Sequence, residues 1–222
     1  SVAAEVEAGG GHALALQIDV REESSVQAAV AEAVAMFGGI DILVNNASAI
    51  MLTGTLQTPM KRFDLMFGVN VRGTFASSQA CIPHLVKAKN PHILNLSPPL
   101  NMDAKWFRNH TAYTMSKYGM SMCTLGMSAE LAERGVAVNS LWPRTTIATA
   151  AIEMNFPAEI LQASRKPAIM ADAACAIFNR DSRRHPGNFY IDESVLREER
   201  GADFAHYAVT PRARLYPDLF LD

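Results

Sequence analysis

Cysteine is scarce in this sequence of 222 residues, and long apolar runs are missing. Cys81, Cys123 and Cys175 are odd in number and widely spaced, which fits neither a disulfide framework nor a zinc pattern. We therefore expect buried free thiols in a reducing compartment, the cytoplasm, and no metal site. No apolar run reaches the roughly 20 residues needed to span a bilayer, which argues against a membrane protein.

An excess of charge of either sign is also missing. The chain has 20 Lys and Arg against 22 Asp and Glu, a net charge of −2. No long basic run occurs, and we expect the densest basic spot, residues 183–185, to be a solvated loop. This distribution argues against a nucleic-acid-binding face. The length and the 49% hydrophobic content suit one globular domain over residues 1–222 with a substantial core.

Short apolar segments alternate with segments of helical periodicity. We predict buried strands within residues 13–18, 40–44, 91–97, 136–141 and 188–191. We predict helices at residues 1–8, 24–37, 59–87 (with a break near Gly68), 111–134 and 168–179. Strands separated by helices of this length indicate βαβ units and an α/β fold, a doubly wound, Rossmann-like parallel sheet.

Ligands in such open sheets bind beyond the carboxyl ends of the strands. Asp19, residues 45–48, Ser97 and residues 142–149 all follow predicted strands, so we expect them along one rim of the sheet. Tyr113 and Lys117 follow the strand at 91–97 by a loop, and their spacing of four puts both on one helix face. An ammonium held there would favour the phenolate, so Tyr113 could exchange a proton near neutral pH. Chance alone can also supply this spacing on a surface helix.

Taken together, these residues resemble the short-chain dehydrogenase/reductase family over nearly the whole chain up to about Asp192. The resemblance rests on five segments in the family's order: Asp19-Val20, Asn45-Asn46-Ala47 with Ser48 in a glycine slot, Asn70, the Tyr113/Lys117 pair, and Val138-Asn139 followed by Pro143. Three further segments, starting at Ser97, Leu141 and Gly187, resemble one branch of the family, whose members can carry a sterol-carrier domain after the reductase domain. We expect no such domain in these residues.

The resemblance implies an NAD(P)-dependent oxidoreductase that interconverts a carbonyl and an alcohol. Tyr113 would pass the proton, Lys117 would lower the pKa of Tyr113 and bind the nicotinamide ribose, and Asn70 would hold a water on the proton path. NADP is favoured, with NAD still open. The implied cofactor contacts are Asp19, Val20, Asn46, Ala47, Tyr113, Lys117, Pro143 and Ile147. Asp19 could instead cap the next helix, and Asn70 could be a surface or kink residue.

The sequence departs from the family pattern in three places. The phosphate-binding glycine loop is not in these residues, so we expect that the N-terminal βαβ part precedes Ser1. Pro98 occupies the slot of the serine that orients the substrate carbonyl. That task could pass to Ser97, to Asn101 or Asn109, or to Tyr113 alone, and Ser97 could merely cap its strand. A third departure is Arg144, which replaces a glycine and could meet a phosphate or an acidic group, or point outward.

The substrate should be small and apolar, because residues 145–167 are expected to cover the pocket with Ile147, Ile152, Met154, Phe156 and Leu161. We expect a homo-oligomer, a dimer or tetramer, formed through the helices at 68–87 and 111–134. The apolar tail at 194–222 should pack on its own domain or on a neighbouring subunit. Two alternatives stay open: a nucleotide-binding scaffold with little turnover, and a reductase of carbon–carbon double bonds in acyl thioesters.

Overall fold

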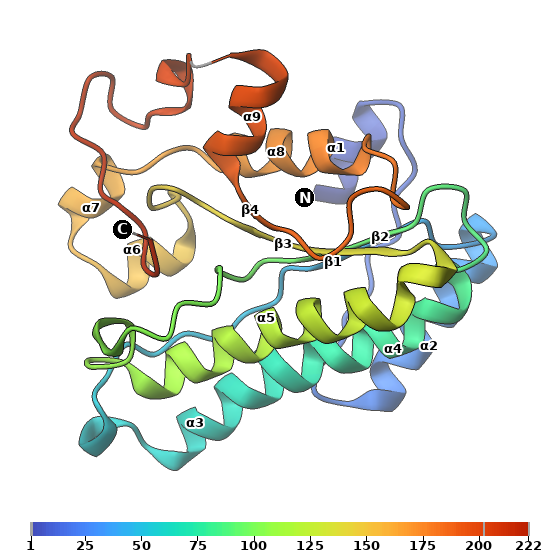
Figure 1. Ribbon diagram of the computed structural model, residues 1–222, viewed down its shortest axis with the longest axis horizontal. Coiled ribbons are helices and arrows are strands. Elements are labelled where there is room, and N and C mark those ends of the chain that lie inside the picture. The colour runs from blue at the N-terminus through green and yellow to red at the C-terminus, as the bar shows by residue number, and fades with distance from the viewer. Residues whose placement is uncertain (1, 202, 222) are drawn as a thin grey trace.

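The computed structural model describes residues 2–201 and 203–221 of the chain. Within these residues, four strands pair in parallel in the order β1-β2-β3-β4, and helices cover both faces of the sheet (Figure 1). The strands are β1 (Ile42–Asn45), β2 (His92–Asn95), β3 (Ala137–Trp142) and β4 (Phe189–Ile191). The α/β fold class predicted from the sequence is confirmed.

The helices predicted from the sequence lie close to their ranges in the structure, and three further helices, at residues 150–155, 158–162 and 192–200, were not predicted. The helices are α1 (Val2–Ala8), α2 (Glu23–Phe37), α3 (Met60–Met66), η2 (Phe67–Gly73), α4 (Thr74–Leu85), α5 (Thr111–Leu131), α6 (Ala150–Asn155), α7 (Ala158–Gln162), α8 (Ala168–Phe178) and α9 (Asp192–Arg200). Short 3-10 turns occur at Thr55–Gln57, Ala104–Trp106, Ala132–Arg134 and Ala205–Tyr207. Gly38 and Gly135 end two of the helical stretches with φ of 84° and 74°, a left-handed conformation that glycine adopts without a steric penalty.

The core lies in two layers, one on each face of the sheet. Ile93 of β2 and Val138 of β3 pack against α4 and α5, whereas Leu94 and Leu141 of the same strands pack against α8 and α9. This division follows from the alternation of side chains along a strand. The central strands β2 and β3 are therefore buried on both faces, as predicted for apolar parallel strands.

A third apolar cluster lies beyond the carboxyl ends of the strands and supports the rim of the sheet. Met66, Tyr113, Tyr118, Trp142 and Phe220 form its buried part. Phe220 comes from the tail, and only 2% of its surface is exposed. The end of the chain thus lies near α6, beside the strand ends, instead of extending from the domain (Figure 1).

The prediction of a strand at residues 13–18 is wrong. This segment is irregular, and in the described residues no strand pairs with it. A strand needs a ladder partner to satisfy its backbone groups, and the apolar pattern alone cannot supply one. Ile18 accordingly stays 43% exposed.

Two further expectations concern exposure. The three cysteines are free, but only Cys81 is buried; Cys123 is half-buried and Cys175 is exposed, which corrects the expectation that all three are buried. None of the described helices is both long enough and apolar enough to cross a membrane.

The helices α3 and α4 form one continuous rod through η2, a π-helical segment that contains Asn70. A π segment has wider turns than an α-helix and often occurs at functional sites. It falls where the sequence predicted a break, near Gly68. The rod packs against α5 through a close approach at Gly119, where an added Cβ would lie 2.6 Å from Cγ2 of Val71.

This contact predicts opposite effects for two glycines of α5. Gly119→Ala should lower the free energy of unfolding by about 1–3 kcal/mol, because the β-branched Val71 has little freedom to move away. Gly126→Ala, which meets open space, should raise it by about 0.5–1 kcal/mol through better helix propensity. Urea unfolding of both variants measures these changes, and a stabilising Gly119→Ala would contradict the described packing.

Candidate active site

Tyr113 and Lys117 lie one turn apart near the start of α5, and both face a cavity of about 440 Å³ beyond the strand ends. Only 5% of Tyr113 and 3% of Lys117 is exposed. The apolar walls come mainly from the loop after β3, from α6 and from the tail, and include Trp142, Pro143, Ile147, Ile152, Phe156, Pro217 and Leu219. Two of the residues expected to cover the pocket, Met154 and Leu161, are not among those that line it, and Met154 is 76% exposed.

The ammonium of Lys117 is held by the rim of the sheet. Nζ donates to the carbonyl of Leu96 at 2.7 Å and to the hydroxyl of Ser48 at 3.4 Å, and it lies 5.1 Å from the ring centroid of Trp142. Burial lowers the pKa of Lys117 to about 8, and the nearby carboxyl of Asp218 acts in the opposite direction. The side chain is therefore mostly cationic at neutral pH and loses its charge just above it.

Tyr113 keeps its proton more firmly than an exposed tyrosine. Burial raises its pKa well above the usual range, and the Asp218 carboxyl raises it further. The expected lowering by Lys117 is not what this structure shows. Within the described residues the Tyr113 hydroxyl has no hydrogen bond, so its proton is available to a molecule in the cavity.

Asn70 links the loop after β1 to α5. Its Oδ1 accepts from the Ala49 N–H at 2.7 Å, and its Nδ2 donates to the Ala49 carbonyl and to the Ser116 hydroxyl, each at 2.9 Å. The Ser116 hydroxyl in turn donates to the carbonyl of Tyr113 at 2.8 Å. Asn70 thus fixes the rim loop against the turn that carries Tyr113.

Ser97 is not brought to the cavity. Its hydroxyl shares a hydrogen bond of 2.9 Å with that of Ser140 in the core, and it is completely buried. Asn101 accepts from the Asp103 N–H within its own loop, and Asn109 is exposed. None of these three residues is among those that line the cavity.

The residues expected to bind a cofactor separate into two places. Asn46, Pro143 and Ile147 line the cavity with the Tyr113/Lys117 pair, and Ala47 precedes Ser48, which lines it too. The Asp19 and Val20 side chains lie outside the lining. The Asp19 carboxylate pairs with Arg21, whose hydrogen bonds hold the pKa of Asp19 at about 2, and a Cβ on Gly73 would meet Val20.

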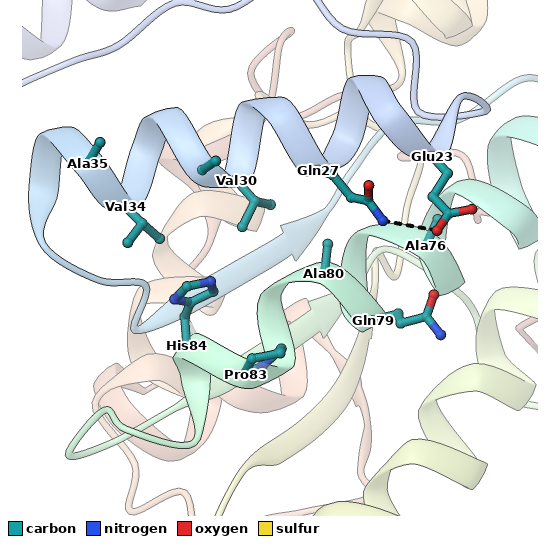
Figure 2. Close-up of a pocket in the computed structure, with 11 residues that line it drawn as sticks. Glu23, Gln27, Val30, Val34, Ala35, Ala76, Gln79, Ala80, Pro83 and His84 are labelled. Carbon is teal, nitrogen blue, oxygen red and sulfur yellow. Dashed lines mark hydrogen bonds between the residues drawn. The ribbon is translucent and has the colours of Figure 1, made fainter.

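A larger hollow of about 710 Å³ lies between α2 and α4 (Figure 2). Its ionisable lining residues are Glu23 in the first turn of α2, which accepts from Gln27, and His84 near the end of α4. The other lining residues are mostly alanine, valine and proline. Glu23 and His84 lie at opposite ends of this hollow (Figure 2), so it does not bring an acid and a base together, and we place the site at Tyr113.

Two comparisons establish the family. The model of the short chain dehydrogenase family matches residues 1–158. Hydroxysteroid dehydrogenase-like protein 2 of Danio rerio is 60% identical over all of this chain. The chain belongs to the short-chain dehydrogenase/reductase family. Proteins of the same name from Rattus norvegicus and Homo sapiens are 57% and 54% identical, which confirms the branch that three segments indicated.

Solved structures of similar dehydrogenases share the fold. A crystal structure from Xanthomonas campestris has a TM-score of 0.96 and 56% identity, and covers 99% of this chain and 80% of that chain. A 7α-hydroxysteroid dehydrogenase complexed with NADH and 7-oxo glycochenodeoxycholic acid has a TM-score of 0.74 and 27% identity, and covers 86% of this chain and 76% of that chain. The chain spans about half the length of the curated relatives, 53% of the Danio rerio protein and 42% of the Rattus norvegicus protein.

The cavity of this short-chain dehydrogenase/reductase fits the nicotinamide end of a dinucleotide. The Lys117 ammonium, the Tyr113 hydroxyl and the Asn46 amide suit the hydroxyls of a ribose, while Pro143 and Ile147 offer apolar surface to a flat ring.

Sequence patterns did not predict that the tail contributes to the site. Tyr216, Pro217, Asp218 and Leu219 all line the cavity of this family member. Their apolar character indicated packing but not where on the domain. An aspartate with no motif around it carries no signal of function.

The role of Asn70 as a link leads to a prediction. Asn70→Ala should lower the free energy of unfolding by about 2–3 kcal/mol, because it leaves both backbone groups of Ala49 without a partner. The matched control is Asn155→Ala in α6, where an exposed amide donates only to the Ala151 carbonyl; it should cost less than about 0.5 kcal/mol. Urea unfolding compares the two, and equal losses would contradict the assigned role.

Proposed function

We propose that this chain carries the catalytic residues of an NADP-dependent oxidoreductase that interconverts a carbonyl and an alcohol. One observation carries the proposal: Tyr113 and Lys117 are nearly buried, yet both line a cavity whose other walls include Asn46, Pro143 and Ile147. A protonated acid and a cation in one water-poor cavity suit a reaction in which negative charge develops on an oxygen.

Tyr113 acts as the acid in the direction of reduction. The nicotinamide, when bound, supplies the hydride for the carbonyl carbon. Tyr113 holds its proton at neutral pH because burial raises its pKa, and the carbonyl oxygen takes that proton as the alcohol forms. Lys117 offsets the charge of the phenolate that remains, from the next turn of the same helix. Oxidation of an alcohol follows the same path backward.

Asn70 contributes by position. Its amide donates both of its hydrogens, one to Ala49 and one to Ser116. We therefore propose that Asn70 holds the rim loop in place beside Tyr113, instead of holding a water as the resemblance implied. Ser97 takes no part in this proposal, because its hydroxyl belongs to the core.

The substrate class and the cofactor follow from the walls and from the relatives. Apolar residues dominate the cavity, which favours a small apolar carbonyl compound. The similar 7α-hydroxysteroid dehydrogenase structure contains NADH, which supports a nicotinamide cofactor. We propose NADP from the branch of the family, with NAD as the alternative.

We further propose a homo-oligomer, a dimer or tetramer, in the cytoplasm. Large apolar side chains are exposed on α4 and α5, the helices expected to associate: Phe75 53%, Met115 43%, Met122 55% and Leu125 55%. Burying such a stripe against a second copy would remove it from water. The free cysteines suit a reducing compartment.

The proposal predicts the effect of removing one hydroxyl. Tyr113→Phe in the intact protein should lower kcat/KM for ketone reduction by about 10²–10⁴-fold, the usual contribution of a general acid. Its free energy of unfolding should change by less than about 1 kcal/mol, because no hydrogen bond to the described chain is lost. The assay follows NADPH oxidation with a panel of apolar ketones.

Tyr118→Phe is the matched control. Its hydroxyl donates to the Asn101 carbonyl at 2.7 Å, so this variant should lose about 1 kcal/mol of stability and keep the activity within a few fold. Equal rates for Tyr113→Phe and the wild type would remove Tyr113 as the acid. No turnover by the wild type on any ketone would favour the scaffold alternative.

A further inference from the structure

Residues of the tail form part of the wall of the cavity. We call residues 216–221 the C-terminal strap. Its backbone is fastened at three points: the Tyr216 N–H donates to the Ala163 carbonyl at 2.9 Å, the Thr146 N–H donates to the Tyr216 carbonyl at 3.0 Å, and the Asp218 N–H donates to the Arg144 carbonyl at 3.2 Å. The strap is therefore a built part of the cavity wall.

Phe220 anchors the strap beside the reactive pair. Its ring lies 6.3 Å from the ring of Tyr113 and nearly parallel to it, and 5.4 and 5.8 Å from Tyr118 and Trp142. Trp142 also donates from Nε1 to the Leu219 carbonyl at 2.9 Å. Phe220 has φ of 73°, an unfavourable conformation for a bulky residue, so its ring contacts must outweigh this strain.

Between these attachments the strap presents Asp218 to the cavity. The carboxyl lines the same cavity as Tyr113 and Lys117. One of its oxygens accepts from the Leu219 N–H at 2.7 Å, and the other has no hydrogen-bonding partner in the described residues. A carboxyl in this state has one free oxygen that can meet a bound molecule.

In the site described above, neither Ser97 nor Pro98 provides the hydrogen-bond donor that the family resemblance implies for the substrate carbonyl. Ser97 is turned into the core, and Pro98 has no donor. We propose that Asp218, in its protonated form, donates a hydrogen bond to the substrate carbonyl oxygen beside Tyr113. The inference rests on the proposed function. Asp218 keeps its proton throughout, while Tyr113 gives up its own.

The burial of Asp218 favours its protonated form up to about neutral pH. Burial raises the pKa of Asp218 to about 7; the Leu219 N–H and Lys117 lower it, and Asp192 raises it. The groups that face the carboxyl are Lys117 and Tyr113 from α5 and Asp192 at the start of α9. Asp192 is tied to the same loop, since it accepts from the Arg144 N–H at 2.8 Å. A buried carboxylic acid that donates a hydrogen bond is a known way to stabilise an oxyanion.

The sign of the pH dependence follows. Below about pH 7 Asp218 is protonated and can donate; above it the donor is lost. The carboxylate that replaces it also raises the pKa of Tyr113, which makes that acid weaker. Both effects lower the rate of carbonyl reduction as pH rises through about 7.

Two substitutions in the intact protein test the assignment. Asp218→Asn keeps the acceptor for the Leu219 N–H and donates at every pH, so it should remain active. Its pH profile should lose the decline of kcat/KM that Asp218 causes near pH 7 and keep the decline that follows the loss of charge on Lys117. Asp218→Ala should lower kcat/KM at pH 6 by about 10²-fold, the typical effect of removing one such donor. Asp103→Asn, at an exposed turn away from the cavity, is the matched control and should leave the whole pH profile unchanged.

A titration without cofactor gives an independent readout. NMR of isotopically labelled aspartate carboxyl carbons, compared between the wild type and Asp218→Asn, should show one carboxyl with a midpoint near pH 7 that the variant lacks. A midpoint near the ordinary value of an aspartate, an unchanged decline in Asp218→Asn, or full activity of Asp218→Ala would each overturn the assignment. If Tyr113→Phe is inactive while these outcomes occur, only the role of Asp218 fails; if Tyr113→Phe is fully active, the proposed function fails and this inference with it.

Discussion

A buried chain of hydrogen-bonded side chains across the carboxyl ends of the strands holds the site in place. The bonded order is Ser78, Asn45, Asn95, Thr124, Ser140 and Ser97, with successive distances between 2.7 and 3.1 Å. These hydrogen bonds join β1, β2 and β3 to one another and to the helices α4 and α5. Each member is buried, so losing one would leave a neighbour unsatisfied. The direction in which α5 presents Tyr113 and Lys117 depends on these bonds, and Ser97 is committed to them.

Burial acts on the three ionisable groups of the cavity in one common direction. It lowers the pKa of Lys117 and raises those of Tyr113 and Asp218, so each group is pushed toward its neutral form. Lys117 is still mostly cationic at neutral pH, and the buried surroundings strengthen its attraction for any negative charge that develops during the reaction. The loop after β3 and the C-terminal strap supply the apolar walls that cause this burial. These walls therefore contribute to the proposed chemistry as well as to the packing.

Sequence patterns predicted the features of the structure that depend on residues close together in the chain. The periodicity of residues 111–134 and the spacing of Tyr113 and Lys117 located both side chains on one face, and Gly38 and Gly135 marked where helical stretches end. They failed where a distant partner decides the outcome. Residues 13–18 have the apolar pattern of a strand but pair with no strand in the described chain. The Ser97 hydroxyl is hydrogen-bonded to Ser140 of strand β3, a partner that lies 43 positions away in the sequence. Asp218 reaches the cavity through an irregular tail whose course no periodicity encodes.

The π segment between α3 and α4 adds one consequence for changes in chain length. Because its turns hold more residues than α-helical turns, it shifts the helical phase between the two halves of the rod. The half before it directs Phe63 and Met66 toward the aromatic cluster, and the half after it directs Ser78 and Leu85 toward the sheet. If the same residues formed an ordinary α-helix, one half would rotate by roughly 100° relative to the other, and deleting one residue between 67 and 73 would compensate for that rotation. In this rod, the number of residues in a single turn sets which side chains meet the core.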